Sequence, residues 1–221
     1  MKNTIITIFL CMLLFSCKQK GWLSNSDGVT VYPSKTSENS AIAVRIKPLK
    51  GGIFEVFASA DKKFTSNPSL SVLTDLGMTE YNVSEDGDLL VIQSENSLAK
   101  ISKTTGKIKF FDSDGNQILQ EIPEGGKTLE PMEIDGKKGY ILRQIFDSQG
   151  DEALYGLGQH QAGEMNYKGK NEELFQYNTK VSVPFIVSTK NYGILWDNYS
   201  LTRFGDPRPY KNLDQFILVF N

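Results

Sequence analysis

Cysteine and histidine are scarce in this sequence, whose 221 residues include two cysteines and one histidine. Cys11 lies in an N-terminal segment that we expect to be removed, and Cys17 would carry a lipid, so no thiol remains for a disulfide or a metal site. We therefore expect no metal and no organic cofactor. An excess of one charge is also missing, because the formal net charge is −2 with acidic and basic residues interleaved. This balance argues against nucleic acid as a partner.

Long apolar runs are missing everywhere except near the N-terminus. After Lys2, the apolar stretch 5–15 is too short to cross a bilayer of about 30 Å as a helix, but it has the pattern of a secretory signal. Ser16-Cys17 then resembles a bacterial lipobox, in which the cysteine becomes lipidated. The sequence thus predicts a signal peptide over 1–16 and an exported lipoprotein, anchored to a membrane through Cys17, in the periplasm or on the outer-membrane surface. The alternative is an ordinary signal peptide in which Cys17 is incidental.

Helical periodicity is absent as well, since no stretch has the pattern of a helix longer than about two turns. Residues 17–40 are polar and aperiodic, which predicts a tether. From residue 41 onward, short apolar segments recur, several with the period of two that is typical of half-buried strands. These segments predict an all-β fold, an antiparallel β-sandwich over 41–221. Strands are expected at 42–46, 51–59, 69–74, 88–94, 98–104, 139–147, 181–189 and 192–198.

Two dipeptides predict hairpins. Asp114-Gly115 lies between two apolar runs within 106–122 and suits the positive φ of a tight turn. Lys190-Asn191 separates the last two predicted strands in a similar way. Pro184 lies inside a predicted strand, where it removes a ladder hydrogen bond, so that strand should be an edge strand or carry a bulge there.

The single histidine, His160, lies in the motif Tyr-Gly-Leu-Gly-Gln-His-Gln at 155–161. A phosphate-binding loop would need a third glycine and a following helix, and neither is present. A catalytic histidine would need a nucleophile or acid at a recognisable spacing, which is also missing. We therefore interpret His160 as structural, and Gly156 and Gly158 as a glycine-dependent turn into a long loop. Residues 156–176 are the longest stretch without a strand pattern, and a loop of that length is expected to have a function.

Three segments carry a resemblance to a known family. They are 153–169 with Tyr-Gly-Leu-Gly, 174–200 with a Pro-Phe strand followed by a Tyr-Gly hairpin, and 202–206. These segments resemble the N-terminal β-sandwich of glycoside hydrolase family 31, and the bacterial α-xylosidase-like members most closely. Residues 40–149 agree with the family only in their strand pattern. The resemblance implies a galactose-mutarotase-like sandwich.

The resemblance also implies a chemistry. The family consists of retaining α-glycosidases, which use a nucleophile and an acid/base whose carboxyl groups lie about 5–5.5 Å apart. In the family both groups come from a (β/α)8 barrel of about 250 residues, which this sequence lacks. We therefore expect no catalytic residue here, but the N-terminal carbohydrate-binding and support domain of an α-xylosidase-like enzyme, truncated at its C-terminus. That enzyme would hydrolyse α-linked glycans such as xyloglucan oligosaccharides. The expected partners are the oligosaccharide and a missing or separately encoded barrel.

The same resemblance places substrate-binding residues just before the Pro-Phe strand. Asn178 and Thr179 are expected to face the sugar, and Gln176 and Tyr177 are weaker candidates. Amide and hydroxyl groups bond sugar hydroxyls, and an aromatic face packs on the apolar side of a sugar ring. The alternative is that this segment only begins a strand, with Asn178 capping a turn.

Two other functions remain open. A free-standing carbohydrate-binding lipoprotein would present the loop 156–180 to an oligosaccharide. A sugar mutarotase would use histidines together with a glutamate as acid and base, which a chain with His160 alone does not offer. Asp197 has no carboxylate partner at a defined spacing, so we interpret it as the end of a hairpin strand next to an inward-packed Trp196.

Overall fold

The structure is a computed structural model that describes residues 21–64, 68–72, 76–148, 150–161 and 163–205, and the backbone of a strand at 215–220. All strand pairs of this described part are antiparallel, and none of its residues is helical. The predicted all-β antiparallel fold is confirmed. The predicted signal peptide and Cys17 lie outside the described residues. Within those ranges, no helix is long and apolar enough to span a membrane.

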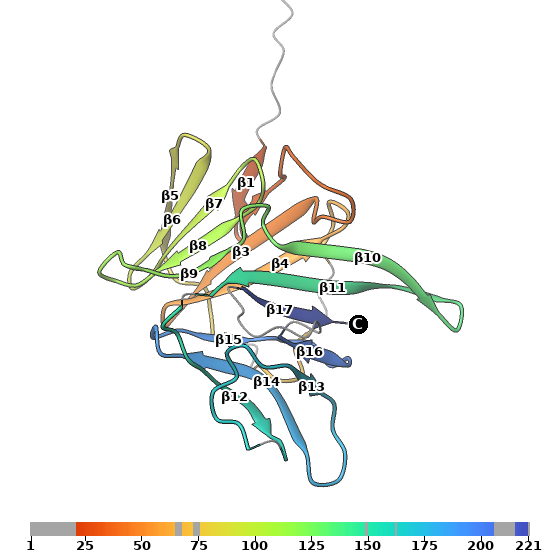
Figure 1. The fold of residues 1–221 in the computed structure, drawn as a ribbon. Helices are drawn as coiled ribbons and strands as arrows, with labels where there is room; N and C mark the ends of the chain where they lie inside the picture. The colour runs from red at the N-terminus through yellow and green to blue at the C-terminus, as the bar shows by residue number, and fades with distance from the viewer. Residues whose placement is uncertain are drawn as a thin grey trace, which may run out of the picture.

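The strands form three sheets (Figure 1). Sheet A has the order β1-β2-β3-β4, with β1 Trp22–Asn25, β2 Gly28–Val31, β3 Ala43–Leu49 and β4 Ile53–Ser59. Sheet C has the order β12-β14-β15, with β12 Leu154–Gln159, β14 Val181–Ser188 and β15 Gly193–Leu195. Sheet B has the order β13-β16-β17-β11-β9-β8-β7-β6-β5, and β10 pairs with β11 at its side. Its strands are β5 Tyr81–Asp86, β6 Leu89–Ser94, β7 Leu98–Ser102, β8 Ile108–Phe111, β9 Gln117–Glu121, β10 Lys127–Ile134, β11 Lys137–Asp147, β13 Glu172–Leu174, β16 Thr202–Phe204 and β17 Gln215–Phe220.

Sheet A covers one end of the long sheet B. Val44 and Ile46 of β3 belong to one buried cluster with Leu90 of β6 and Ile101 of β7, and these side chains are at most 1% exposed. Burying each such aliphatic side chain stabilises the fold by about 1.5–3 kcal/mol. The two sheets therefore form a sandwich, the upper half of the molecule in Figure 1.

Sheet C covers the other end of sheet B. Leu154 and Ile186 of sheet C form a second buried cluster with Phe146 and Phe204 of sheet B. Trp196, just after β15, packs against this cluster, which confirms its predicted inward position. One continuous sheet thus carries two cores, and the predicted β-sandwich is confirmed.

Two sequence predictions about the segments before residue 75 are wrong. Residues 22–31 lie in the predicted tether but form β1 and β2, which pair with each other and with β3. All four residues of β2 are buried, so this strand lacks the alternation of apolar and polar residues that is typical of a half-buried strand. Residues 68–72 form no strand, although one was predicted at 69–74. The Ser69 hydroxyl instead accepts the Val72 N–H and donates to the Asp197 carboxylate. These two hydrogen bonds hold the segment in a bend.

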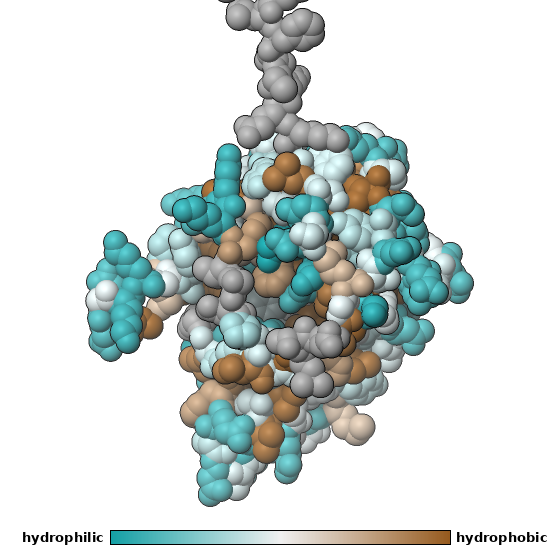
Figure 2. All heavy atoms as spheres, turned by 180° about the vertical axis from the view of Figure 1, so that it is seen from behind, coloured by the Kyte–Doolittle hydropathy of each residue, from teal (hydrophilic) through white to brown (hydrophobic). Residues whose placement is uncertain are grey.

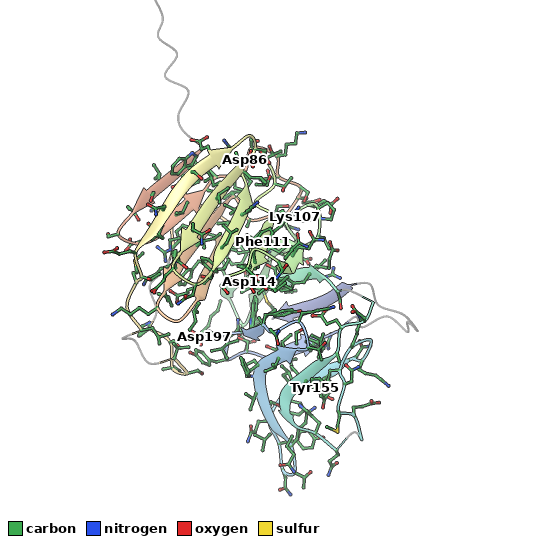
Figure 3. All side chains as sticks on the ribbon, turned by 90° about the vertical axis from the view of Figure 1, so that its left-hand side faces the viewer. Asp86, Lys107, Phe111, Asp114, Tyr155 and Asp197 are labelled. Carbon is green, nitrogen blue, oxygen red and sulfur yellow. The ribbon has the colours of Figure 1, made fainter. Side chains whose placement is uncertain are left out.

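Both predicted hairpins are confirmed. At the β8–β9 turn, labelled by Asp114 in Figure 3, Gly115 has a φ of +84°, and an Asp112 carboxylate oxygen accepts the Asp114 and Asn116 N–H groups at 3.0 and 2.8 Å. Hydrogen bonds from the Asn116 side chain and backbone lower the pKa of Asp112. Between β14 and β15, Asn191 has a φ of +60° and its N–H donates to the Ser188 carbonyl.

Pro184 lies in a bulge of a central strand. β14 is flanked by β12 and β15, so it is not an edge strand. Gly156 faces Ile186 and Gly158 faces Ser182, so a single residue of β12 spans three residues of β14 around Pro184. The bulge that the sequence allowed as an alternative to an edge position is therefore confirmed.

A buried ion pair joins β9 to β10. The Lys127 ammonium donates to the Glu121 carboxylate, and both side chains are less than a tenth exposed, at 7% and 2%. Glu121 also accepts the Ile108 N–H at 2.9 Å. Burial raises the pKa of Glu121 and lowers the pKa of Lys127, because the interior disfavours each charged form more than their mutual attraction favours it.

Candidate functional site

The Tyr-Gly-Leu-Gly stretch forms a kink within β12. Gly156, Leu157 and Gly158 all have positive φ, at +126°, +65° and +95°. A Cβ on Gly156 or Gly158 would lie 2.3 or 2.1 Å from a carbonyl oxygen of β14, so only glycine fits at both positions. The sequence predicted a tight turn here that glycine allows, leading into a long loop. The positive φ values agree with this use of glycine, but the strand continues through the kink to Gln159. The loop is shorter than 156–176, because β13 also falls inside that range.

His160 follows this kink and is buried by its surroundings. Its side chain is 2% exposed, and its Nε2–H donates a hydrogen bond of 2.7 Å to the Leu157 carbonyl. Nδ1 lies 3.2 Å from a carboxylate oxygen of Glu172 on β13. The Tyr167 ring meets the imidazole edge-on, with ring centroids 6.1 Å apart. These contacts agree with the structural role that we inferred from the sequence.

Glu172 also binds Lys180. The Lys180 ammonium donates to the same carboxylate oxygen at 2.6 Å and to the Glu173 carbonyl at 2.6 Å. The Glu172 and Lys180 side chains are 12% and 10% exposed.

The pKa of the neighbouring Tyr167 phenol is raised. Burial is the larger cause, and the negative charges of Glu172 and Glu164 add to it. The name "clamp" is used below for His160, Glu172 and Lys180.

The four predicted sugar-binding residues lie together, in and beside one tight turn at 177–180. The Lys180 N–H donates to the Tyr177 carbonyl at 3.0 Å, which leaves Asn178 and Thr179 at the exposed tip. Thr179 has a φ of +71°, and its hydroxyl accepts a hydrogen bond from Gln161 at 2.9 Å. The turn that we had kept as an alternative is thus present, and Asn178 is one of its central residues.

The four side chains are not equally available. The Gln176 amide oxygen accepts the Ser182 N–H at 3.4 Å, and Thr179 is engaged with Gln161. Asn178 is exposed, and its amide forms no hydrogen bond with any described residue. The Tyr177 ring, 48% exposed, leans on the Phe175 ring, 51% exposed, with centroids 5.2 Å apart. Amide, hydroxyl and exposed aromatic rings together are the groups that bind sugars.

Sequence reasoning missed three contributors to this site. Phe175 lies just outside the segment 176–179 to which the resemblance pointed, and it joins the site through its ring contact with Tyr177. Gln161 and Glu172 lie in the stretch without strand pattern, and they reach the turn only because β13 and the end of β12 converge on it. No signal in the sequence indicates this convergence.

Two acidic side chains outside the clamp, Glu152 and Asp197, are engaged by internal donors. An open pocket of about 300 Å³ lies beside β9 and the segment 147–152. Its buried Glu152 accepts hydrogen bonds from Ser148 at 2.9 Å, Ser188 at 2.5 Å and Tyr192 at 2.5 Å. Asp197, near the junction of the upper and lower parts in Figure 3, accepts from Ser69 at 3.0 Å and Tyr199 at 2.7 Å. In the described ranges, no three His, Cys, Asp or Glu residues lie together as a metal site would need.

Sheet C has a second, unusual face. Along β14 the even-numbered residues point inward, while the odd-numbered residues point outward and are all apolar. These outward side chains are 40% to 45% exposed, and Tyr155 and Leu195 on the neighbouring strands add to them. Figure 2 shows one side of the molecule, on which apolar residues lie among polar ones in the lower as well as in the upper half. The name "outer face" is used below for Tyr155, Val181, Val183, Phe185, Val187 and Leu195.

Comparisons with known proteins match this architecture. Residues 43–204 match the family model "Glycosyl hydrolase 31 N-terminal galactose mutarotase-like domain". The chain is 32% identical over 168 residues to the α-xylosidase of Saccharolobus solfataricus, covering 72% of this chain and 22% of that protein. It superposes on the crystal structure of the family 31 α-xylosidase of Xanthomonas citri with a TM-score of 0.77 and 44% identity, covering 83% of this chain and 20% of that one.

A family 31 α-xylosidase from a soil metagenome, solved with xylose, shares the fold at a TM-score of 0.68 and 24% identity, covering 90% of this chain and 32% of that one. The chain therefore spans between about a fifth and a third of the length of these relatives.

Proposed function

Because this chain belongs to glycoside hydrolase family 31, as the sequence resemblance indicated, we propose that it serves an enzyme that releases α-linked xylose from xyloglucan-type oligosaccharides. Its described fold is that of the family's N-terminal domain. The observation that carries the proposal is the similarity to the α-xylosidase of Xanthomonas citri over most of this chain. In this role the domain supports the catalytic part of the enzyme and presents the turn 177–180 to the sugar.

Hydrolysis is not assigned to this chain itself. A barrel of about 250 residues does not fit in 221 residues that already hold a two-core sandwich. Retaining hydrolysis also needs two carboxyl groups that are open to the sugar. The buried Glu121 and Glu152 and the partly buried Glu172 are instead held by internal donors.

A direct assay tests this division of labour. The purified chain is incubated with p-nitrophenyl α-xyloside and p-nitrophenyl α-glucoside, and release of nitrophenol is followed. We expect no turnover above that of a heat-denatured sample. Turnover that co-purifies with the chain and disappears when one of its own carboxylates is changed to an amide would refute the proposal.

The outer face supports a docking role. A contiguous set of exposed apolar side chains without a charged residue is typical of a surface that another polypeptide covers. In the relatives, the matching domain is joined to the remaining two-thirds to four-fifths of the polypeptide, so such a partner is already tethered to it. We assign the outer face to contact with that catalytic part.

A chimera tests the docking. This chain replaces the matching segment of the Xanthomonas citri α-xylosidase, and activity on p-nitrophenyl α-xyloside and soluble yield are measured. Val187→Glu should lower both at least about tenfold, since the charge would be buried in the contact. Ile134→Glu, at a 59% exposed position on the β10–β11 hairpin, is the matched control and should leave both unchanged. Equal behaviour of the two variants would remove the outer face from the proposal.

Sugar binding by the chain alone is a second candidate function, favoured by the exposed pair Phe175 and Tyr177. Calorimetry against xyloglucan oligosaccharides separates the two functions. A free-standing binding protein should show micromolar affinity, whereas one wall of a larger enzyme pocket should show millimolar affinity or weaker.

A further inference from the structure

The exposed turn 177–180 contains a strained residue. Thr179 is β-branched, and its φ of +71° places it in the left-handed region, which such residues avoid. Glycine or asparagine would form the same turn at lower cost. A strained conformation persists only when its surroundings impose it, and such residues cluster where a ligand is held.

A second strained residue lies at the far end of a chain of polar contacts that leads to this turn. Leu157 has a φ of +65°, and its carbonyl accepts the His160 Nε2–H at 2.7 Å. His160 Nδ1 in turn lies 3.2 Å from a Glu172 carboxylate oxygen, and that oxygen accepts a hydrogen bond from Lys180, the residue that follows Thr179. Because these groups are shielded from water, their interactions are stronger than on an open surface.

Gln161 contacts the turn from the side of the loop. Its amide donates to the Thr179 hydroxyl at 2.9 Å, and it directly follows His160 in the chain. The base of the loop is fixed as well, since the Tyr167 N–H donates to the Leu154 carbonyl at 2.7 Å. The tip of the turn is therefore held from two sides, by Gln161 and by the clamp.

We propose that Gln161 and the clamp of His160, Glu172 and Lys180 are positioning residues that hold the Asn178–Thr179 turn in a strained shape, ready for a saccharide. This inference rests on the proposed function, which places the turn against the sugar. None of the four residues needs to touch the sugar. A turn that is already ordered loses less conformational entropy when the sugar binds, and this smaller loss raises the affinity. The strain that destabilises the free protein is thereby offset in the bound state.

Relief of the strain provides the central test. Thr179→Gly should raise Tm by about 2–4 °C, because glycine adopts this φ without cost. The same variant should weaken binding of methyl α-D-xylopyranoside and of a xyloglucan heptasaccharide at least about fivefold, followed by two-dimensional NMR titration. Asp135→Gly is the matched control, since Asp135 has a φ of +50° at the tip of the distant β10–β11 hairpin. It should leave the affinity for both sugars unchanged.

Hydrogen exchange tests the positioning without any sugar. In Gln161→Ala and Glu172→Gln, exchange of the Lys180 amide should accelerate at least about tenfold, while exchange of core amides such as that of Ile92 stays the same. Unchanged Lys180 exchange in both variants overturns the positioning role alone. A Thr179→Gly chain that binds sugar as tightly as the parent also overturns it. A parent chain that binds neither sugar, even at tens of millimolar, overturns the sugar-facing part of the proposed function.

Discussion

The buried pair Glu121–Lys127 yields the sharpest stability prediction. In Glu121→Gln the amide oxygen still accepts the Ile108 N–H, so the change isolates the loss of the carboxylate charge. Among the described residues, the Lys127 ammonium then keeps only the Gly125 carbonyl, at 3.4 Å. Leaving one charge of a buried pair without its partner costs about 3–5 kcal/mol of unfolding free energy. Lys127→Met should cost a similar amount, because the carboxylate is left buried and must bind a proton.

The double variant should behave differently. Burial raises the pKa of Glu121 and lowers the pKa of Lys127, so the interior resists both charges, and replacing both by neutral groups should cost little. With both charges gone, Glu121→Gln/Lys127→Met should return to within about 1–2 kcal/mol of the parent.

Urea unfolding at pH 7, followed by circular dichroism, measures all four chains of this cycle, with the slope of each transition compared to confirm a common two-state process. The reasoning is refuted if each single variant stays within about 1 kcal/mol of the parent, or if the double variant loses the sum of the two single losses.

Three further predictions concern the β12 kink, the Glu152 cluster and the β8–β9 turn. Gly158→Ala should cost at least about 3 kcal/mol in urea unfolding, since its Cβ would lie 2.1 Å from the Val181 carbonyl oxygen, whereas Gly150→Ala, with nothing within 4 Å, should change little. Tyr192→Phe removes a donor from buried Glu152 and should cost about 1.5–3 kcal/mol, while Tyr140→Phe, on the exposed hairpin, should stay within about 0.5 kcal/mol; equal losses would contradict this. The lowered pKa of Asp112 adds stability above the carboxyl's unfolded pKa of about 3.9, and this stability is lost as pH falls through the folded pKa. Acid titration of unfolding should therefore be flatter below about pH 4 in Asp112→Asn than in the parent.

Strands and turns with a local cause could be predicted from the sequence. Asp114-Gly115 and Lys190-Asn191 form their turns because residues at those positions accept a positive φ. Pro184 produces a bulge because it has no N–H to donate. The family was indicated by segments 153–169 and 174–200, which contain the kink and the bulge together.

Features with a distant cause could not be predicted. All four residues of β2 are buried, so both faces of this strand are covered. The strand therefore lacks the alternation of apolar and polar residues by which a half-buried strand is recognised in a sequence. Segment 69–74 has the composition of a strand, but Ser69 is held by a hydrogen bond to Asp197, which lies far along the chain. The outer face reverses the usual rule, because the outward-pointing residues of β14 are all apolar, whereas two of its four inward-pointing residues are serines. The alternation along β14 therefore predicts the opposite side as the buried one.

The bulge at Pro184 adds two residues to β14 relative to β12, and two is the side-chain repeat of a strand. Val181 on one side of the bulge and Val187 on the other therefore still emerge from the same surface. An insertion or deletion of one residue there would turn half of β14 over and place Ile186 or Val181 on the wrong side. Length variation at this point in relatives should accordingly occur in even steps, and aligned sequences with an odd step should show the opposite polarity pattern in one half of the strand.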